Sequence, residues 1–159
     1  MKNNILIYFI FIFVLSFFFE NKVKGQELQF NATEIQSLEK GNKIIARNGV
    51  EIIDPKGIVI KADQGEYDKI LSIIKVKHNV EVTDLTNNYV LTTSEAVYFV
   101  NEDKIISKNE TVIKIEEKYT IDTYNVTYDR NLKEIFSKNK TIVQDNYNNI
   151  LKANNFKLS

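Results

Sequence analysis

The 159-residue chain has no cysteine and no tryptophan, and only one histidine, one proline and five glycines. The absence of cysteine excludes disulfides, zinc fingers, redox motifs and thiol nucleophiles. The single histidine, His78, leaves the usual catalytic triads without their residues. Basic and acidic residues balance at 21 each, so no basic excess indicates nucleic-acid binding. We therefore expect no enzymatic activity, no cofactor, no metal site and no nucleic-acid partner.

The first 25 residues have the layout of a secretory signal peptide. Lys2 precedes an apolar run, Ile5–Phe19, and Val23 and Gly25 occupy the −3 and −1 positions of a small-residue cleavage site. Cleavage there would make Gln26 the new N-terminus. An uncleaved anchor is the alternative, but a helix of about 15 residues spans about 22 Å, less than the hydrocarbon core of a bilayer. We therefore predict a Sec-type signal peptide.

The mature segment, residues 26–159, is expected to form one domain that repeats every 30 or 31 residues. Columns of similar residues keep this spacing, and all of them share a one-residue insertion near Asn87-Asn88. Independent columns would not share one insertion by chance, so the repeat is a property of the fold. The apolar columns are Phe30, Ile60, Leu91, Ile121 and Leu151; Ile44, Ile74, Ile105 and Ile135; Val50 and Val80, followed by Thr111 and Thr141; and Ile52, Val82, Ile113 and Val143.

Each repeat contains two strand-like runs rich in β-branched residues, typified by Gly57–Asp63 and Val80–Asp84. Asp54–Gly57 has the residues of a turn. Asn48-Gly49 and its equivalents (His78-Asn79, Asn109-Glu110 and Asn139-Lys140) indicate a turn or bulge between the Ile and Val columns. We therefore predict an all-β domain with about nine strands. The pattern fits both a parallel solenoid and an antiparallel meander.

The apolar columns must face an apolar environment, which is either a closed core between two sheets or a groove that admits acyl chains. General physics favours the closed core, because each fully buried Ile contributes about 1.5–3 kcal/mol. Aliphatic linings also suit hydrocarbon chains better than sugars or nucleotides. The candidate lining of a lipid groove is Phe30, Ile44, Val50, Ile52, Ile60, Ile74, Val80, Val82, Leu91, Ile105, Ile113, Ile121, Ile135 and Val143.

Two further features have ordinary interpretations. The tyrosines at one repeat position, Tyr67, Tyr98 and Tyr128, are expected at the sheet margin with their hydroxyls in water. His78 occupies a position held by Asn in other repeats, which indicates a surface turn.

An acidic group, Asp63, Glu66 and Asp68, has the residue types of a calcium site. Only one repeat carries these charges, which favours a solvated loop.

Two strings give the chain a family resemblance. Ile60-Lys61-Ala62-Asp63-Gln64-Gly65-Glu66-Tyr67-Asp68 is followed by His78-Asn79-Val80-Glu81-Val82, and Phe30–Ile35 is followed by Gly41–Ile52. This alternation resembles the OstA domain, which occurs in the lipopolysaccharide-transport proteins LptA and LptC and in the N-terminal periplasmic part of LptD, the organic solvent tolerance protein. The resemblance covers about residues 28–159, and the opening string is most similar to the LptD-type domain.

The resemblance implies an antiparallel β-taco or β-jellyroll, with two sheets in a V. It implies a lipopolysaccharide-binding protein of the periplasm or outer membrane, whose groove shields the lipid A acyl chains. Its partners would be other OstA-fold Lpt proteins, stacked edge to edge, or an outer-membrane barrel. The third and fourth repeats lack the glycine of the family pattern, which affects the local shape of the groove.

Residues 150–158 supply half a repeat whose residues are mostly apolar. We expect them to form an exposed edge that joins a further β domain, through Leu151, Ala153, Phe156 and Leu158. Two other functions remain open from the residues alone. One is a secreted structural or adhesive β-solenoid without lipid cargo. The other is a carbohydrate-active β-helix enzyme, which would need clustered acids across several repeats.

Overall fold

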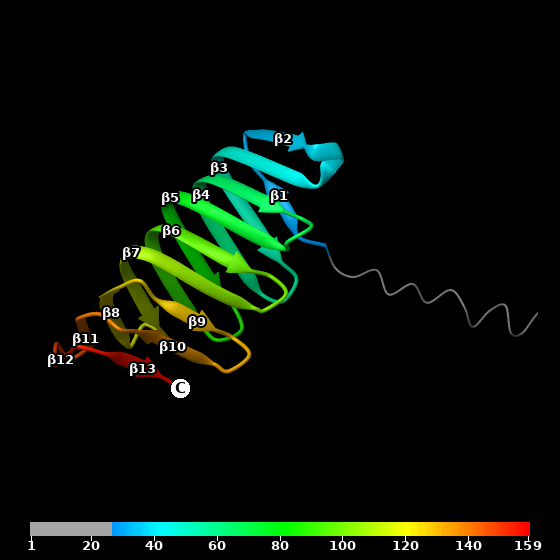
Figure 1. Ribbon diagram of the computed structural model, residues 1–159. Helices are drawn as coiled ribbons and strands as arrows, with labels where there is room; N and C mark the ends of the chain where they lie inside the picture. Colours follow the sequence, from blue (N-terminus) through cyan, green and yellow to red (C-terminus); the bar gives the residue numbers. More distant parts are fainter. Residues whose placement is uncertain (1–26) are drawn as a thin grey trace, which may run out of the picture.

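The computed structural model describes residues 27–159 (Figure 1), and the predicted signal peptide lies outside the described residues. The described chain is all-β, as predicted, and every strand pair is antiparallel. The antiparallel pairing decides between the two arrangements that the repeat left open. The elements in chain order are β1 (Gln29–Asn31), β2 (Glu34–Leu38), η1 (Glu39–Gly41), β3 (Lys43–Asp54), β4 (Ile58–Asp68), β5 (Ile73–Asp84), β6 (Tyr89–Phe99), β7 (Lys104–Ile115), β8 (Tyr119–Tyr124), β9 (Thr127–Asp129), β10 (Glu134–Ser137), β11 (Thr141–Asp145), β12 (Ile150–Ala153) and β13 (Phe156–Leu158).

The strands form one folded sheet in which neighbours in sequence are mostly neighbours in space. Its main path runs β1-β3-β4-β5-β6-β7-β8-β11-β12, while β2, β9, β10 and β13 pair off this path. The long strands β3 to β7 belong to both parts. We call the part along the main path the first half-sheet and the part that contains β2, β9, β10 and β13 the second half-sheet.

Each long strand bends near its middle, which folds the two half-sheets over each other (Figure 1). The register between neighbouring strands shifts at this bend, for example between Arg47 and Val50 in β3. Asn48, His78 and Asn109 adopt positive φ angles of 62°, 62° and 67° there. Asn tolerates this left-handed conformation better than most residues, and a bulge strengthens the local bend. The predicted turn or bulge at this repeat position is therefore confirmed in these three repeats, with His78 exposed as expected.

Residues 27–159 form thirteen strands rather than about nine. The difference arises because β1 and β2, β8 and β9, β10 and β11, and β12 and β13 each correspond to one bent strand that is interrupted at the bend. The repeat therefore predicts the number of bent strands, whereas the interruptions depend on local geometry.

Hairpin turns form two parallel rows at the ends of the half-sheets. The first rim contains the turns at residues 55–57, 85–88 and 116–118, and the second rim contains those at 39–42, 69–72, 100–103 and 130–133. Backbone hydrogen bonds link successive turns within each row: Leu85 N donates to Gly57 O (2.9 Å) and Glu116 N to Asn88 O (3.1 Å) in the first, and Lys69 N to Asn42 O (2.8 Å), Val100 N to Ser72 O (3.0 Å) and Arg130 N to Asp103 O (3.1 Å) in the second. Each rim is thus a continuous hydrogen-bonded row.

The core lies between the half-sheets and consists of the repeat columns. Because side chains alternate between the faces of a strand, every second residue of β3 to β7 points inward. Near the bend the core side chains change from apolar to polar along the chain. Ala46 and Val76 stand there in the earlier repeats, whereas Ser107 and Ser137 stand there in the later ones. No buried side-chain polar atom of residues 27–159 lacks a hydrogen-bond partner.

The polar part of the bend is held by paired hydroxyls. Ser107 Oγ lies 2.8 Å from Thr111 Oγ1 and accepts a 2.9 Å hydrogen bond from Val126 N, while Thr123 Oγ1 lies 2.8 Å from Thr141 Oγ1. These hydroxyls occupy the third and fourth repeats, which lack the glycine of the family pattern. The bend there is held by side-chain hydrogen bonds as well as by the backbone.

Candidate functional site

The predicted groove lining faces the space between the half-sheets, where its residues pack against one another. Three of these residues are half-buried and lie toward the ends of the sheet: Phe30, Ile44 and Val143. The other eleven are at most 4% exposed: Val50, Ile52, Ile60, Ile74, Val80, Val82, Leu91, Ile105, Ile113, Ile121 and Ile135. The structure therefore contains a closed apolar core at this place. That these residues line a lipid groove stays a prediction.

The two rims meet along a line that we call the seam, and side-chain hydrogen bonds cross it. Tyr98, from the second half-sheet, donates its hydroxyl to Asp54 Oδ2 of the first (2.5 Å). One repeat later, Tyr128 donates in the same way to Asp84 Oδ2 (2.6 Å). The four side chains are at most 4% exposed. Two Tyr–Asp pairs at equivalent positions therefore tie the half-sheets together.

Arg130 adds a buried ion pair to the seam. Its Nε lies 2.7 Å from Asp84 Oδ2, and its Nη1 lies 2.8 Å from Asp103 Oδ1. Its Nη2 donates to the backbone oxygen of Lys56 (3.0 Å) on the first rim. The Arg130 side chain is only 7% exposed. One guanidinium group from the second rim thus binds both a carboxylate and a backbone oxygen of the opposite rim.

The network determines the charge states of its members. Burial alone would raise the pKa of the Asp84 carboxyl, but hydrogen bonds from Arg130, Tyr128 and Asn87 outweigh burial and lower this pKa from 3.8 to about 2. Burial and the hydrogen bond to a carboxylate raise the pKa of both Tyr98 and Tyr128. Because the pKa of Asp84 is lower in the folded state, its contribution to stability is complete above about pH 4 and is lost as the pH falls through about 2.

The seam changes in chemistry along its length. At its N-terminal end Phe30 and Tyr67 stack across it, with ring centroids 5.4 Å apart and planes at 20°. At its C-terminal end Ile115 and Leu158 occupy the repeat positions of Asp84 and Tyr128 and pack against the core. Among the side-chain hydrogen bonds of residues 27–159, those between the rims are confined to the middle section. The seam is therefore aromatic, then polar, then aliphatic.

The seam corrects the expectation for the tyrosine column. Tyr98 and Tyr128 are buried and hydrogen-bonded to carboxylates, whereas their hydroxyls were expected in water. The reason is that Asp54 and Asp84 lie at the ends of facing strands and offer acceptors inside the fold. Each Tyr follows its Asp partner by 44 residues, an offset that is not a multiple of the 30-residue period, so the repeat columns gave no signal of the pairing.

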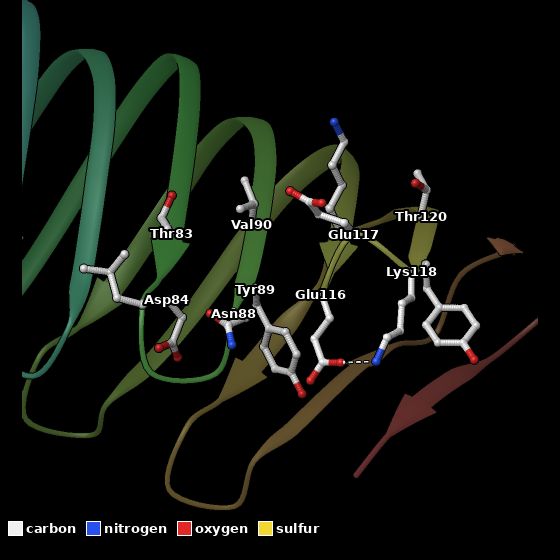
Figure 2. Close-up of a pocket in the computed structure, with 12 residues that line it drawn as sticks. Thr83, Asp84, Asn88, Tyr89, Val90, Glu116, Glu117, Lys118 and Thr120 are labelled. Carbon is white, nitrogen blue, oxygen red and sulfur yellow. Dashed lines mark hydrogen bonds and ion pairs between the residues drawn. The ribbon is translucent and has the colours of Figure 1, made fainter. Parts of the chain in front are cut away.

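A depression of about 950 Å³ lies over the first rim between β5 and β8, and its lining includes Asp84 of the seam (Figure 2). Figure 2 shows Thr83, Val90 and Thr120 pointing to one side of it, and Tyr89 and the Glu116–Lys118 ion pair to the other. The pair is well exposed, with Nζ and Oε2 2.8 Å apart. The depression brings together no group of buried polar side chains that would recognise a small ligand.

The acidic group behaves as a set of surface residues, but on a strand rather than in the expected loop. Asp63, Glu66 and Asp68 all lie in β4. Asp63 accepts a hydrogen bond from Asn79 (2.8 Å), and Glu66 pairs with Lys43 (3.1 Å). Residues 27–159 contain no cluster of His, Asp or Glu suited to a metal ion, and no helix in that range is long and apolar enough to span a membrane.

The predicted docking residues lie on outer strands of the sheet. Within the described part of the chain β12 pairs only with β11 and β13 only with β10, so each strand has one edge without a partner there. Leu151 is exposed, whereas Ala153, Phe156 and Leu158 are half-buried. The edge is thus where the sequence places it, and docking there stays a prediction.

Comparison with known proteins gives a match at the level of structure. No family model matches the sequence, and no curated protein is similar in sequence. The chain is similar in structure to LptH from Pseudomonas aeruginosa, described as the LptA-homologous periplasmic component of the conserved lipopolysaccharide transport device. The TM-score is 0.60 over 80% of this chain and 94% of LptH, at 12% sequence identity. This likeness shows a shared fold, the β-jellyroll that the resemblance implies.

Proposed function

We propose that this protein is a periplasmic lipopolysaccharide-binding protein that shields the acyl chains of lipid A between its half-sheets and helps to deliver lipopolysaccharide to the outer membrane. The observation that carries the proposal is the fold shared with LptH, a component of a lipopolysaccharide transport device. The export signal predicted for residues 1–25 is consistent with a periplasmic location.

The chemistry of the interior supports an acyl-chain cargo. The columns between the half-sheets are aliphatic along most of the molecule, and the half-sheets are joined by a bend on one side and by non-covalent contacts at the seam on the other. Parting the seam would expose one continuous apolar strip flanked by polar rims. An amphiphile with several acyl chains and a polar headgroup has the matching distribution of surface.

Site-specific photocrosslinking tests the proposal. A photoreactive residue at Ile52, Val82 or Ile113 should capture lipopolysaccharide, because these side chains point between the half-sheets and are at most 3% exposed. The same residue at Lys61 or Glu81, which point outward from neighbouring positions, should capture little or none. Equal labelling at all five positions would show that the cargo is not held between the half-sheets.

The partner side of the proposal is edge-strand stacking. The outer edges of β12 and β13 have no strand partner in residues 27–159, and an unpaired edge is a template for a strand of another domain. We propose that an OstA-fold Lpt protein, or the periplasmic part of an outer-membrane barrel protein, extends the sheet there.

Replacing Ala153 and Asn155 together with proline should reduce association with such a partner by at least about tenfold, since proline removes a backbone donor at the end of β12 and restricts the segment between β12 and β13. Pulldown from the native envelope, followed by affinity measurement, is the readout. Asn146→Pro is the matched control, because Asn146 lies in the turn begun by Asp145, where proline is tolerated. If the double-proline variant binds its partners like the parent, this edge is not the docking site.

A second candidate is a secreted structural or adhesive protein without cargo. The closed core favours it, because such a protein needs stability and no opening. The photocrosslinking experiment separates the two: a structural protein yields no lipid adduct at any interior position.

A further inference from the structure

The polar middle of the seam combines two features that a purely structural core does not require. It places two buried Tyr–Asp pairs and a buried arginine at the mouth of an otherwise apolar interior. It also joins the half-sheets on the side opposite the bend, where a separation would open the interior. The arrangement therefore stands between the solvent and the apolar columns.

We infer that the seam residues Asp54, Tyr98, Asp84, Tyr128 and Arg130 form a latch that controls the passage of acyl chains into the interior. This inference rests on the proposed function and names the route and the residues by which that function would be carried out.

The first argument is the direction of the bonds. Tyr98 and Tyr128 belong to the second half-sheet, and the carboxylates they bind belong to the first. The Arg130 contacts with Asp84 and with the Lys56 oxygen also run from the second half-sheet to the first, whereas Lys56 Nζ donates in the opposite direction, to Val100 O (3.1 Å). Because these bonds join the two rims, separating the half-sheets must break them.

The second argument concerns the cost of opening. Hydrogen bonds between polar groups are exchanged for hydrogen bonds with water when the groups separate, so the net cost of each is small. An apolar seam would instead expose hydrocarbon to water in proportion to its area. Breaking a polar seam therefore adds less to the cost of opening than breaking an apolar seam of the same area, and a shut polar seam still excludes acyl chains.

The third argument is the match between an open latch and an amphiphile. With the seam parted, Asp54, Asp84 and Arg130 lie on the polar rims, and the aliphatic columns lie directly beneath them. Acyl chains would contact the columns, and the polar headgroup would stay at the rims in water. The middle section carries this polarity, whereas the two ends are apolar: Phe30 stacks on Tyr67 at one end, and Ile115 and Leu158 pack against the core at the other.

The test uses hydroxyl removal, which weakens the latch and leaves the ion pairs of Arg130 with Asp84 and Asp103 in place. The double variant Tyr98→Phe, Tyr128→Phe keeps both rings and removes both hydroxyls that bind the carboxylates. Stopped-flow mixing with fluorescently labelled lipopolysaccharide measures the rate of uptake. We expect uptake to be about tenfold faster than in the parent, since two hydrogen bonds no longer hold the half-sheets together.

Two controls separate the latch from other effects. Tyr124→Phe removes an equivalent hydroxyl from an exposed side chain outside the seam, and its uptake rate should equal that of the parent. Ile105→Val loosens the buried core without touching the polar network, so it reports the effect of lower global stability alone.

The outcomes are distinguishable. Faster uptake in the double tyrosine variant, with both controls at the rate of the parent, supports the latch. Lipid binding by the double tyrosine variant alone, with no uptake by the parent, supports it as well. Equal uptake rates in the parent and the double variant overturn the latch but leave lipid binding intact. An acceleration in Ile105→Val as large as that in the double variant overturns the latch too. If neither the parent nor any variant binds lipopolysaccharide, the proposed function fails and the latch fails with it.

Discussion

Replacing Arg130 with methionine should lower the free energy of unfolding by about 3–5 kcal/mol, because the change leaves the buried Asp84 carboxylate without its cation. Asp84 is 1% exposed and binds Arg130 Nε at 2.7 Å. Methionine retains much of the arginine's aliphatic volume, so the loss reports mainly on charge and hydrogen bonding. Urea-induced unfolding followed by circular dichroism at pH 7 measures the effect.

A control variant and a double variant make this prediction specific. Lys118→Met removes the cation of an ion pair of similar length, 2.8 Å, but both partners are exposed. It should leave the unfolding midpoint unchanged, since exposed pairs contribute little. Adding Asp84→Asn to Arg130→Met should recover part of the loss, because the uncompensated charge is removed. A cost for Arg130→Met no larger than that of Lys118→Met would show that the buried pair does not hold the seam.

The parts of the fold that the sequence predicts correctly depend on local patterns. Asn48-Gly49 and His78-Asn79 indicate the bend because Asn and Gly accept positive φ whatever surrounds them. Columns such as Ile74 and Ile105 indicate inward positions because side chains alternate along a strand. Both kinds of signal act within a few residues of chain, so they can be read without knowing which strands face each other.

The seam was missed because it depends on contacts between distant residues. Asp54 looks like a turn residue, and its carboxylate does accept a hydrogen bond from Lys56 N (2.8 Å). Its other partner, Tyr98, is 44 residues away, which is about one and a half repeats. Only the folding of one half-sheet onto the other reveals that offset, so a period of 30 residues conceals the pairing.

The same limit applies to the distinction between core and groove. Ile52, Val82 and Ile113 occupy the same inward position of their strands whether the strands close on each other or open around a ligand. The sequence therefore predicts the inward face, while the distance between the half-sheets is set by the rims. In this structure the rims are joined by the polar seam, and the columns form a closed core.

The same Ile→Ala substitution should lower the free energy of unfolding by different amounts in different repeats of one column. Ile44 of β3 and Ile74 of β5 occupy the same column, one repeat apart. They lie on either side of Tyr67 in β4, which is the cross-strand partner of both. Ile74 is fully buried, whereas Ile44 is half-buried near the N-terminal end. Ile74→Ala should therefore lower the free energy of unfolding by about 2–5 kcal/mol, through lost apolar burial and the cavity that remains.

Ile44→Ala is the matched comparison, because the same atoms are removed from the same repeat position. It should cost less than half as much as Ile74→Ala, since solvent already reaches Ile44 and no enclosed cavity forms. Chemical denaturation of both variants, with equal slopes against denaturant concentration, gives the comparison. Equal costs would mean that the two levels of the stack are equally enclosed, and the closed core would then have to extend to the N-terminal end of the sheet. A cost below about 1 kcal/mol at Ile74 would instead mean that the half-sheets collapse onto the vacated space, which is the flexibility that a lipid-admitting interior requires.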